Sequence, residues 1–282
     1  MEKGALIGIG MTAEVYEWGT DKVLKLYFKR FSDDWARREA GIGMAVCEAG
    51  VSSPKVYETI EKDGRKGVIF QRISGKSIME HIITEPYMLH SYAQRVARLH
   101  YRIHKCFSDN LPSQRERFEY TLGRSSKILG KRIDRILEYM EHLPDGNTVC
   151  HGDLHFDNII ISGNKLVPID WSAAYRGSPL GDVARVCMII ISPSVPPFVP
   201  DFLAFLSGCI RQQICRAYLE EYMRLANVSL KDIDPWILPV AAAKLKDKVP
   251  GEEKWLMDIV NRRLDDYDKS NLPEVNCHEF QN

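Results

Sequence analysis

The residues best suited to chemistry lie in one stretch, 150–171, which reads CHGDLHFDNIIISGNKLVPIDW. Two short apolar runs flank Gly163-Asn164, a pattern typical of a β-hairpin with a two-residue loop. The register of such a hairpin brings Asn158 and Asp170 together at its open end. An amide oxygen and a carboxylate are ligands that Mg²⁺ accepts, with phosphate and water oxygens completing its shell.

Asp153 adds a third polar side chain to this end of the hairpin. It lies five residues before Asn158, in the loop that leads into the first strand. A carboxylate in this position can take the proton from a hydroxyl group next to a metal-bound phosphate. These residue types and spacings together predict a site for phosphoryl transfer.

The segment HGDLHFDN followed by IDW resembles the catalytic segment of the aminoglycoside phosphotransferase and choline kinase-like family, which is in turn similar to protein kinases. The resemblance implies ATP and Mg²⁺ as cofactors, with Asp153 as catalytic base and Asn158 and Asp170 as metal ligands. The implied reaction moves the γ-phosphoryl group to a hydroxyl of a small molecule. The implied fold is α+β and bilobal, as in protein kinases, with a small N-terminal antiparallel-sheet lobe carrying one helix and a larger, mainly helical C-terminal lobe.

Several neighbours of these residues carry weaker expectations. His151 is expected to pack and form hydrogen bonds rather than act as a base, and the role of His155 stays open. Asp157 replaces a residue that is often glycine in the family, and we expect it to face solvent. Ser172 stands where many members carry an acid. In R-G-S-P-L-G-D-V-A-R, the resemblance implies that Asp182 braces the catalytic loop, although it could equally be an acid at a helix N-terminus.

The N-terminal segment contains a glycine-rich loop. Gly8, Gly10 and Ala13 fit the kinase pattern G-x-G-x-x-G-x-V with alanine in place of the third glycine. Small residues there let backbone N–H groups approach phosphates. The flanking residues predict a hairpin followed by a third strand, 22–28, and no helix follows the glycines as a dinucleotide fingerprint requires.

Lys25 lies in the third predicted strand. Strand alternation puts Leu24 and Leu26 on one apolar face and Lys25 on the other. A solvated lysine is one interpretation, and the family resemblance implies the other, a lysine that binds the α- and β-phosphates. Such a lysine needs a carboxylate partner, for which Glu39 on the following helix is the candidate and Glu48 the reserve.

The passage between lobes is predicted near Ser74. The apolar segment before it leads into Gln71-Arg72-Ile73, whose main chain is where adenine would dock in a kinase-like fold; Gln71 and Ile73 are the candidate residues. We therefore expect a nucleotide-binding lobe at 1–74 and a catalytic and substrate-binding lobe at 75–282.

The C-terminal part is predicted to be mainly helical. His100 and His104 lie one turn apart on a helix with an apolar stripe, and a packed pair is favoured over a metal site because no third ligand is evident. Further helices are predicted at 128–140, 201–225, 228–248 and 252–268, with a proline-rich loop at 192–200 and a frayed end at 270–282.

Composition narrows the class of protein. Lysine plus arginine equals aspartate plus glutamate at 38 each, so no global charge attracts nucleic acid. No stretch reaches the length of a membrane span, and seven cysteines without a CxxC pair favour reduced thiols and a cytoplasmic location. Oligomeric state is unknown from the sequence.

Other interpretations are weaker. Metallophosphoesterases contain G-D-x-H but also need an upstream D-x-H and a later G-N-H, and both are missing here. A kinase-shaped nucleotide-binding module without strong activity, or a protein kinase, is the alternative function. The acceptor stays open among aminoglycosides, choline-like compounds, sugars and amino-acid derivatives. A cationic aminoglycoside would want acidic residues, for which the sequence offers Glu220, Glu221, Asp232, Asp234 and Asp247.

Overall fold

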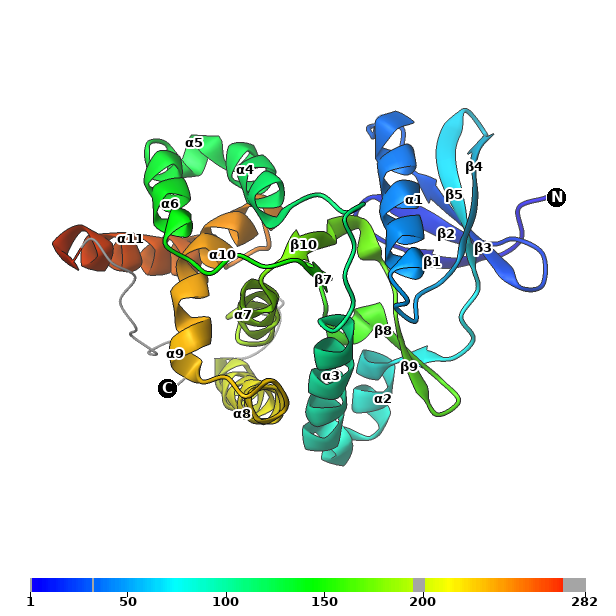
Figure 1. Cartoon of the computed structure of the whole chain (residues 1–282). Helices are drawn as coiled ribbons and strands as arrows, with labels where there is room; N and C mark the ends of the chain where they lie inside the picture. The colour runs from blue at the N-terminus through cyan, green and yellow to red at the C-terminus, as the bar shows by residue number, and fades with distance from the viewer. Residues whose placement is uncertain (1, 32, 195–200, 271–282) are drawn as a thin grey trace.

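The computed structural model describes residues 2–31, 33–194 and 201–270, and they form two lobes (Figure 1). The N-terminal lobe contains β1 (Leu6–Ile9), β2 (Ala13–Glu17), β3 (Lys22–Tyr27), α1 (Asp33–Glu48), β4 (Val56–Lys62) and β5 (Arg65–Gln71). The C-terminal lobe begins with β6 (Lys76–Ser77), α2 (Ile78–Thr84), α3 (Leu89–Ile103), α4 (Gln114–Arg124), α5 (Ser126–Leu129) and α6 (Arg132–Glu141). It continues with β7 (Thr148–Cys150), β8 (Ile159–Ser162), β9 (Lys165–Pro168), β10 (Tyr175–Gly177), α7 (Pro179–Ile190), α8 (Asp201–Ala226), α9 (Leu230–Ile233), α10 (Ile237–Lys244) and α11 (Glu253–Ser270).

The N-terminal lobe is an antiparallel sheet in the order β1-β2-β3-β5-β4 with α1 against one face (Figure 1). On β3, Leu24 and Leu26 are fully buried on the face away from α1, as strand alternation predicts. The opposite face carries Tyr27, which packs with Ala36 and Ala40 of α1. Lys25 lies on this second face, so the sheet directs its side chain toward the helix.

The predicted hairpin is confirmed. Strands β8 and β9 pair antiparallel, with Ile160 opposite Val167 and Ser162 opposite Lys165, which leaves Gly163-Asn164 as the loop. Gly163 has φ of 56°, in the left-handed region that two-residue hairpin loops require. β6 pairs with the other side of β8, so the chain joins this small sheet as soon as it leaves the N-terminal lobe.

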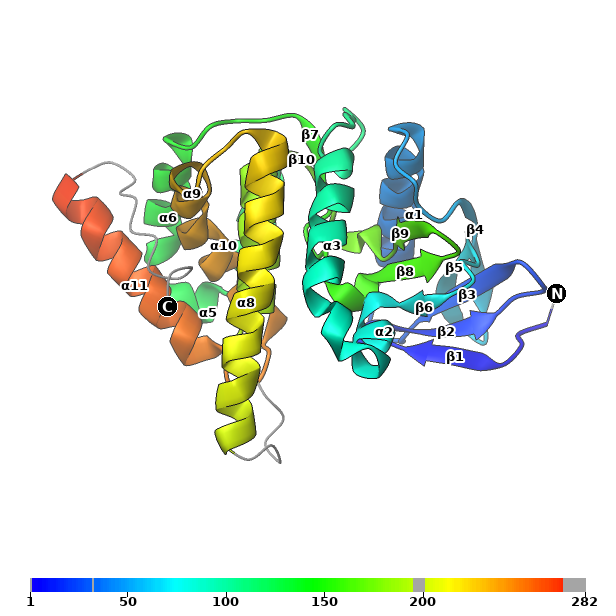
Figure 2. The same cartoon turned by 90° about the horizontal axis from the view of Figure 1, so that it is seen from below.

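The C-terminal lobe is built around α7, which is buried along most of its length. Helices α3 and α8 pack side by side, with α3 on the side of the β8–β9 hairpin and α8 on the side away from it, while α10 packs against both α7 and α11 (Figure 2). The α+β, bilobal, kinase-like architecture expected from the sequence is confirmed. The position of the domain boundary near Ser74 stays a prediction.

Two predicted helices were wrong in extent. The helix at 128–140 is two helices, because Gly130 adopts φ of 54° and ends α5 before α6 starts at Arg132. The helix at 228–248 is divided into α9 and α10 by a 3-10 turn at Asp234–Trp236, where Pro235 interrupts the backbone hydrogen bonds. In the predicted loop 192–200 only 192–194 are described, as loop, and all but the first residue of the predicted frayed end 270–282 lies outside the described residues.

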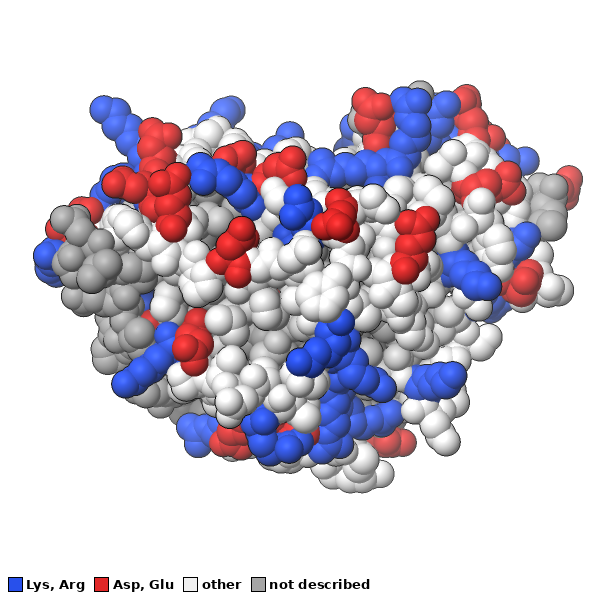
Figure 3. Space-filling view, in the orientation of Figure 1, with Lys and Arg blue, Asp and Glu red and all other residues white. Residues whose placement is uncertain are grey.

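Basic and acidic side chains are interspersed over the face shown in Figure 3, with a group of basic residues over α3 in its lower middle. This distribution agrees with the balanced composition. Within the described residues, no helix is both long enough and apolar enough to span a membrane.

Candidate active site

The open end of the hairpin holds the two residues predicted as metal ligands. Ile169 N–H donates to the Asn158 carbonyl at 2.9 Å, which extends the hairpin register to this end. The Asn158 side-chain amide donates to the Asp153 carbonyl at 3.0 Å. With its N–H₂ group held in this way, Asn158 has its amide oxygen available as a ligand.

Asp170 has an unusual backbone conformation, with φ of 59° and ψ of 66°. Aspartate tolerates the left-handed region better than most residues do. Its Oδ1 accepts a hydrogen bond from Lys25 Nζ at 3.0 Å. The Asp170 side chain is 40% exposed. The surrounding protein opposes its ionisation by desolvation, but the Lys25 ammonium outweighs this effect, and the pKa of Asp170 is lowered.

Lys25 also contacts Glu39, the partner expected from the sequence. Its Nζ lies 2.7 Å from Glu39 Oε1, and Tyr27 Oη donates to Glu39 Oε2 at 2.7 Å. Burial lowers the pKa of Lys25, but Glu39 and Asp170 outweigh this effect and raise it. The reserve partner, Glu48, instead lies 3.4 Å from the Asn110 amide at the far end of α1.

The loop before Asp153 is anchored to the core by Asp182. Its carboxylate accepts the backbone N–H of His151 at 2.5 Å and that of Gly152 at 2.9 Å. Gly152 has φ of 75°, and a Cβ there would lie 2.4 Å from the Ala173 carbonyl oxygen, so only glycine fits. The bracing role that the resemblance implied for Asp182 therefore has a direct structural basis.

Behind Asp182 lies a fully buried polar network. His100 Nε2 lies 2.9 Å and His104 Nε2 3.4 Å from Asp182 Oδ2. The Nδ1 atoms of the two rings each lie 2.6 Å from a tyrosine hydroxyl, that of Tyr218 and that of Tyr222. The Asp182 carboxylate is thus a possible third metal ligand, which the sequence did not reveal. However, every ring nitrogen of the two histidines already has a protein partner. The packed-pair interpretation is favoured.

His151 is completely buried and packs on Trp171, with ring centroids 4.4 Å apart, as expected for a structural residue. Its Nε2 lies 3.1 Å from the Ile169 carbonyl oxygen. Burial lowers the pKa of His151, although nearby carboxylates partly oppose this. Asp157 is exposed, also as expected.

Asp153 is held from the side opposite the hairpin by Arg185. The guanidinium Nη2 lies 3.1 Å from Asp153 Oδ1 and 2.6 Å from Asp247 Oδ2. Asp247 also pairs with Lys246 at 3.0 Å. Burial raises the pKa of Asp247, but the two cations outweigh it and lower the pKa to about 2. His155 Nε2 lies 4.0 Å from the other oxygen of Asp153.

The residues of the glycine-rich loop form the β1–β2 hairpin. Gly10 N–H donates to the Ala13 carbonyl at 2.8 Å, which closes the turn. A Cβ on Gly8 would meet only Val15 at 3.8 Å, and one on Gly10 only the Ala13 oxygen at 3.7 Å, so the protein's own packing does not require glycine at either position. Such a surface fits a nucleotide that approaches the backbone closely. Ala13 itself is buried against α1.

At the end of β5, some of the backbone N–H groups already form hydrogen bonds within the protein. Gln71 N–H donates to the Lys55 carbonyl and Arg72 N–H donates to the Asp21 carbonyl, each at 2.8 Å. The Gln71 side chain accepts from Lys55 N–H at 3.3 Å. Of the predicted adenine-binding segment, this leaves the main chain of Ile73 as the group suited to a base.

The structure thus brings Lys25, Glu39 and Asp170 together and places Asn158 and Asp153 beside them. Sequence reasoning missed Arg185, although it lies three residues after Asp182 within a motif already singled out. It considered Asp247 only as a possible ligand for a cationic acceptor. The contact of the half-buried Arg185 with a loop carboxylate becomes visible only in the folded structure.

Comparison with known proteins agrees with this fold. The family model described as "Phosphotransferase enzyme family" matches residues 3–221. A solved aminoglycoside-3'-phosphotransferase of type VIII shares 18% identity with a TM-score of 0.57, covering 88% of this chain and 93% of that one. The amicoumacin kinase hAmiN, in complex with AMP-PNP, Ca²⁺ and Ami, shares 14% identity with a TM-score of 0.60, covering 98% and 91%. A thermostable mutant of aminoglycoside phosphotransferase APH(4)-Ia with ADP and hygromycin B shares 16% identity with a TM-score of 0.61, covering 94% and 93%.

Among curated proteins, an uncharacterized protein of Metamycoplasma hominis is 43% identical over 56 residues. The match covers 19% of this chain and 11% of that protein. At these identities the structural neighbours establish the fold alone, and the family model establishes the family.

Proposed function

The chain belongs to the phosphotransferase enzyme family, and from this membership and the site geometry we propose that it transfers the γ-phosphoryl group of ATP to a hydroxyl of a small molecule. The observation that carries the proposal is the position of Lys25 between Glu39 of its own lobe and Asp170 of the other, at 2.7 and 3.0 Å. This contact joins the nucleotide-facing sheet to the hairpin end where Asn158 lies. Asp153 stands beside the same end.

Each residue has a role in this proposal. Lys25 binds the α- and β-phosphates, and Glu39 keeps its ammonium in place. The loop tip between Gly10 and Ala13 covers the phosphates, while the main chain of Ile73 receives adenine. Asp153 accepts the proton of the attacking hydroxyl, because its loop leads into the hairpin and its carbonyl accepts from the side-chain amide of Asn158, a proposed metal ligand.

Asn158 and Asp170 would hold Mg²⁺. Their oxygen donors fit a hard cation, and the lowered pKa of Asp170 keeps its carboxylate ionised. When bound, the metal neutralises the charge of the transferred phosphoryl group.

The proposal is tested by Mg²⁺-dependent ADP release from ATP across a panel of hydroxylated amines, sugars, acids and aminoglycosides, with Asp153→Asn in parallel. We expect turnover with one acceptor class and a loss of ~10²–10⁴-fold in the variant, the usual contribution of a general base. Binding of Mg·ATP should be unchanged in Asp153→Asn, because this residue does not contact the nucleotide in the proposed arrangement. Absence of Mg·ATP binding by the wild-type protein would refute the kinase function and favour a binding module.

A further inference from the structure

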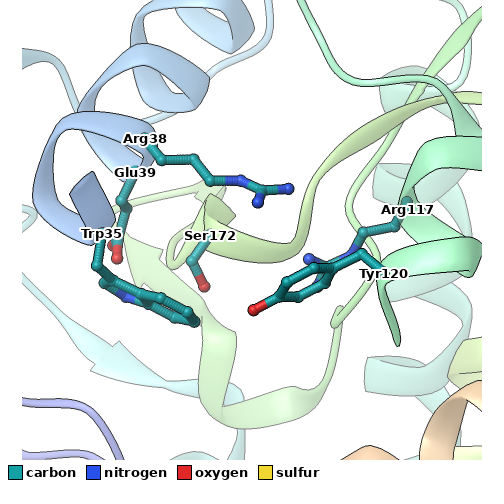
Figure 4. Close-up of a pocket in the computed structure, with 6 residues that line it drawn as sticks. All are labelled: Trp35, Arg38, Glu39, Arg117, Tyr120 and Ser172. Carbon is teal, nitrogen blue, oxygen red and sulfur yellow. The ribbon is translucent and has the colours of Figure 1, made fainter. Parts of the chain in front are cut away.

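A pocket lies between the lobes, next to the residues of the candidate active site. It is lined by Trp35, Arg38 and Glu39 of α1, Arg117 and Tyr120 of α4, and Ser172 (Figure 4). Glu39 also holds Lys25, and Ser172 follows Asp170 by two residues. The pocket therefore shares a wall with the phosphoryl-transfer residues.

Two of the residues that line the pocket are arginines. Arg38 and Arg117 come from different lobes and extend toward each other across it, and Ser172 lies on the side of Trp35 and Glu39 (Figure 4). Arg38 lies over the Tyr120 ring, 5.2 Å from its centroid, which fixes its direction. Within the part of the chain that the structure describes, neither guanidinium has a carboxylate partner.

Burial and neighbouring positive charges disfavour the charged form of Arg117 when no carboxylate is paired with it. Arg117 is half-buried, and α4 packs against the turn Leu245–Asp247, which carries Lys246. Burial first, and then the positive fields of Arg185 and Arg38, lower the pKa of Arg117 to about 10. An arginine held in this way without an anion is typical of a site that binds one.

Four of the five acidic residues that the sequence offered to a cationic acceptor are already engaged, and the fifth, Glu220, lies exposed on α8. Asp247 is held by Arg185 and Lys246, and Glu221 by Arg98 and Arg224. Asp232 caps the N-terminus of α9. Asp234 is buried in an ion pair with Arg263.

Resting on the proposed function, we propose that the phosphoryl acceptor is a small hydroxylated anion, a carboxylate or a phosphate ester, whose charged group binds between Arg38 and Arg117. The hydroxyl of the same molecule is then directed toward Asp153, which adjoins the pocket on the side of Arg117: the charge of Arg185 acts on Arg117, and Arg185 holds Asp153. On the other side, Glu39 of the pocket holds Lys25, which contacts Asp170. A planar guanidinium binds both oxyanions in a bidentate manner, so both chemical classes share this site. Trp35 and Tyr120 supply an aromatic wall for the carbon skeleton.

The test measures binding without turnover. Glycerate and glycerol 3-phosphate are titrated by calorimetry into the protein saturated with Mg·AMP-PNP, with glycerol and choline as the neutral and cationic counterparts. We expect at least one anion to bind at least tenfold more tightly than both counterparts. Tighter binding of glycerate would identify the acceptor as a carboxylate, and tighter binding of glycerol 3-phosphate would identify it as a phosphate ester.

Variants assign the binding to the pocket. Arg117→Gln should weaken binding of the anion about ten- to hundredfold, as expected for a lost charge-assisted hydrogen bond, and Arg117→Lys should restore part of it. Arg115→Gln is the matched control, because Arg115 lies on the same helix but is exposed and paired with Glu119 and Glu141. Its affinity for the anion should stay within twofold of wild type.

Equal binding of anions, glycerol and choline overturns the proposal, as does an Arg117→Gln variant that binds the anion like wild type. A separate titration of the protein with Mg·AMP-PNP alone tests the nucleotide site. If the protein does not bind Mg·AMP-PNP, the kinase function fails, and the anion titrations without nucleotide still decide whether the pocket binds anions.

Discussion

Arg185 is the residue whose substitution separates positioning of Asp153, the proposed base, from binding of the nucleotide. Its Nη2 bridges Asp153 and Asp247, at 3.1 and 2.6 Å, and only 12% of its side chain is exposed. Burial lowers the pKa of Arg185, but the two carboxylates outweigh it and raise the pKa, so the cation is permanent. Arg185→Gln keeps most of the side-chain volume and removes the charge.

The size of the effect follows from the contacts that are lost. A hydrogen bond to a charged group is worth about 1.5–3 kcal/mol, and Asp153 is 39% exposed, so water replaces part of the lost interaction. If this free energy is lost only in the transition state, kcat falls about 10- to 150-fold, since each 1.36 kcal/mol is a factor of ten. KM for ATP should change less than twofold, because Arg185 does not reach Lys25 or the metal ligands.

Steady-state kinetics with ATP varied at saturating acceptor measures both parameters. Arg185→Lys should recover part of kcat, since a lysine restores the charge without the two-pronged geometry. Arg216→Gln, an exposed position on α8, serves as the control for loss of a surface arginine. An unchanged kcat in Arg185→Gln, or a rise in KM for ATP at constant kcat, refutes the positioning role.

Two further predictions concern the groups on either side of the loop. Glu39→Gln should raise KM for ATP about tenfold, because Lys25 loses about 1.5 kcal/mol of ionic attraction. Glu48→Gln, on the same helix, should leave KM for ATP unchanged. Equal kinetics for the two variants would contradict the pairing of Glu39 with Lys25. Burial, and then His100, lower the pKa of His104 to about 4, compared with about 6.5 in an unfolded chain. Because the unfolded state binds the proton first, stability should fall by about 3 kcal/mol as pH drops from 6.5 to 4, as measured by urea unfolding. His104→Gln should flatten this slope and the exposed His142→Gln should not, and an unaltered slope in His104→Gln contradicts the assignment.

Local sequence patterns were sufficient where neighbouring residues determine the structure. The hairpin at Gly163-Asn164 follows from loop length and strand alternation, and its register places Asn158 opposite Ile169, the residue before Asp170. The direction of Lys25 on β3 followed from the two-residue period of a strand. The hairpin and the direction of Lys25 both depend on residues close together in the chain, so the sequence pattern predicts them directly.

Tertiary contacts were beyond the sequence for a physical reason. Asp182 could have been an ordinary acid in the first turn of a helix, and only the packing of α7 beneath the loop shows that it accepts the N–H groups of His151 and Gly152. The break at Gly130 was equally hidden, because a glycine inside an apolar pattern is compatible with a continuous helix at a cost of about 1 kcal/mol. Arg185 and Asp247 meet across 62 residues, a separation at which no periodicity gives information.

The distribution of charge distinguishes the two halves of the interlobe region. Glu39, Asp170 and Lys25 together carry a net charge of −1, which suits a cation such as Mg²⁺ at the exposed oxygen of Asp170. Arg38 and Arg117 bring two positive charges to the adjoining pocket, where Glu39 of the shared wall is the one acidic lining residue and is itself paired with Lys25. In a site of low effective dielectric such opposite fields act over several ångströms, so a molecule that offers a hydroxyl at one end and an anion at the other is held in a single orientation. A polycationic acceptor would meet the arginines first and be repelled, which is why the substitution at Arg117 should change the order of preference among acceptors rather than only the rate.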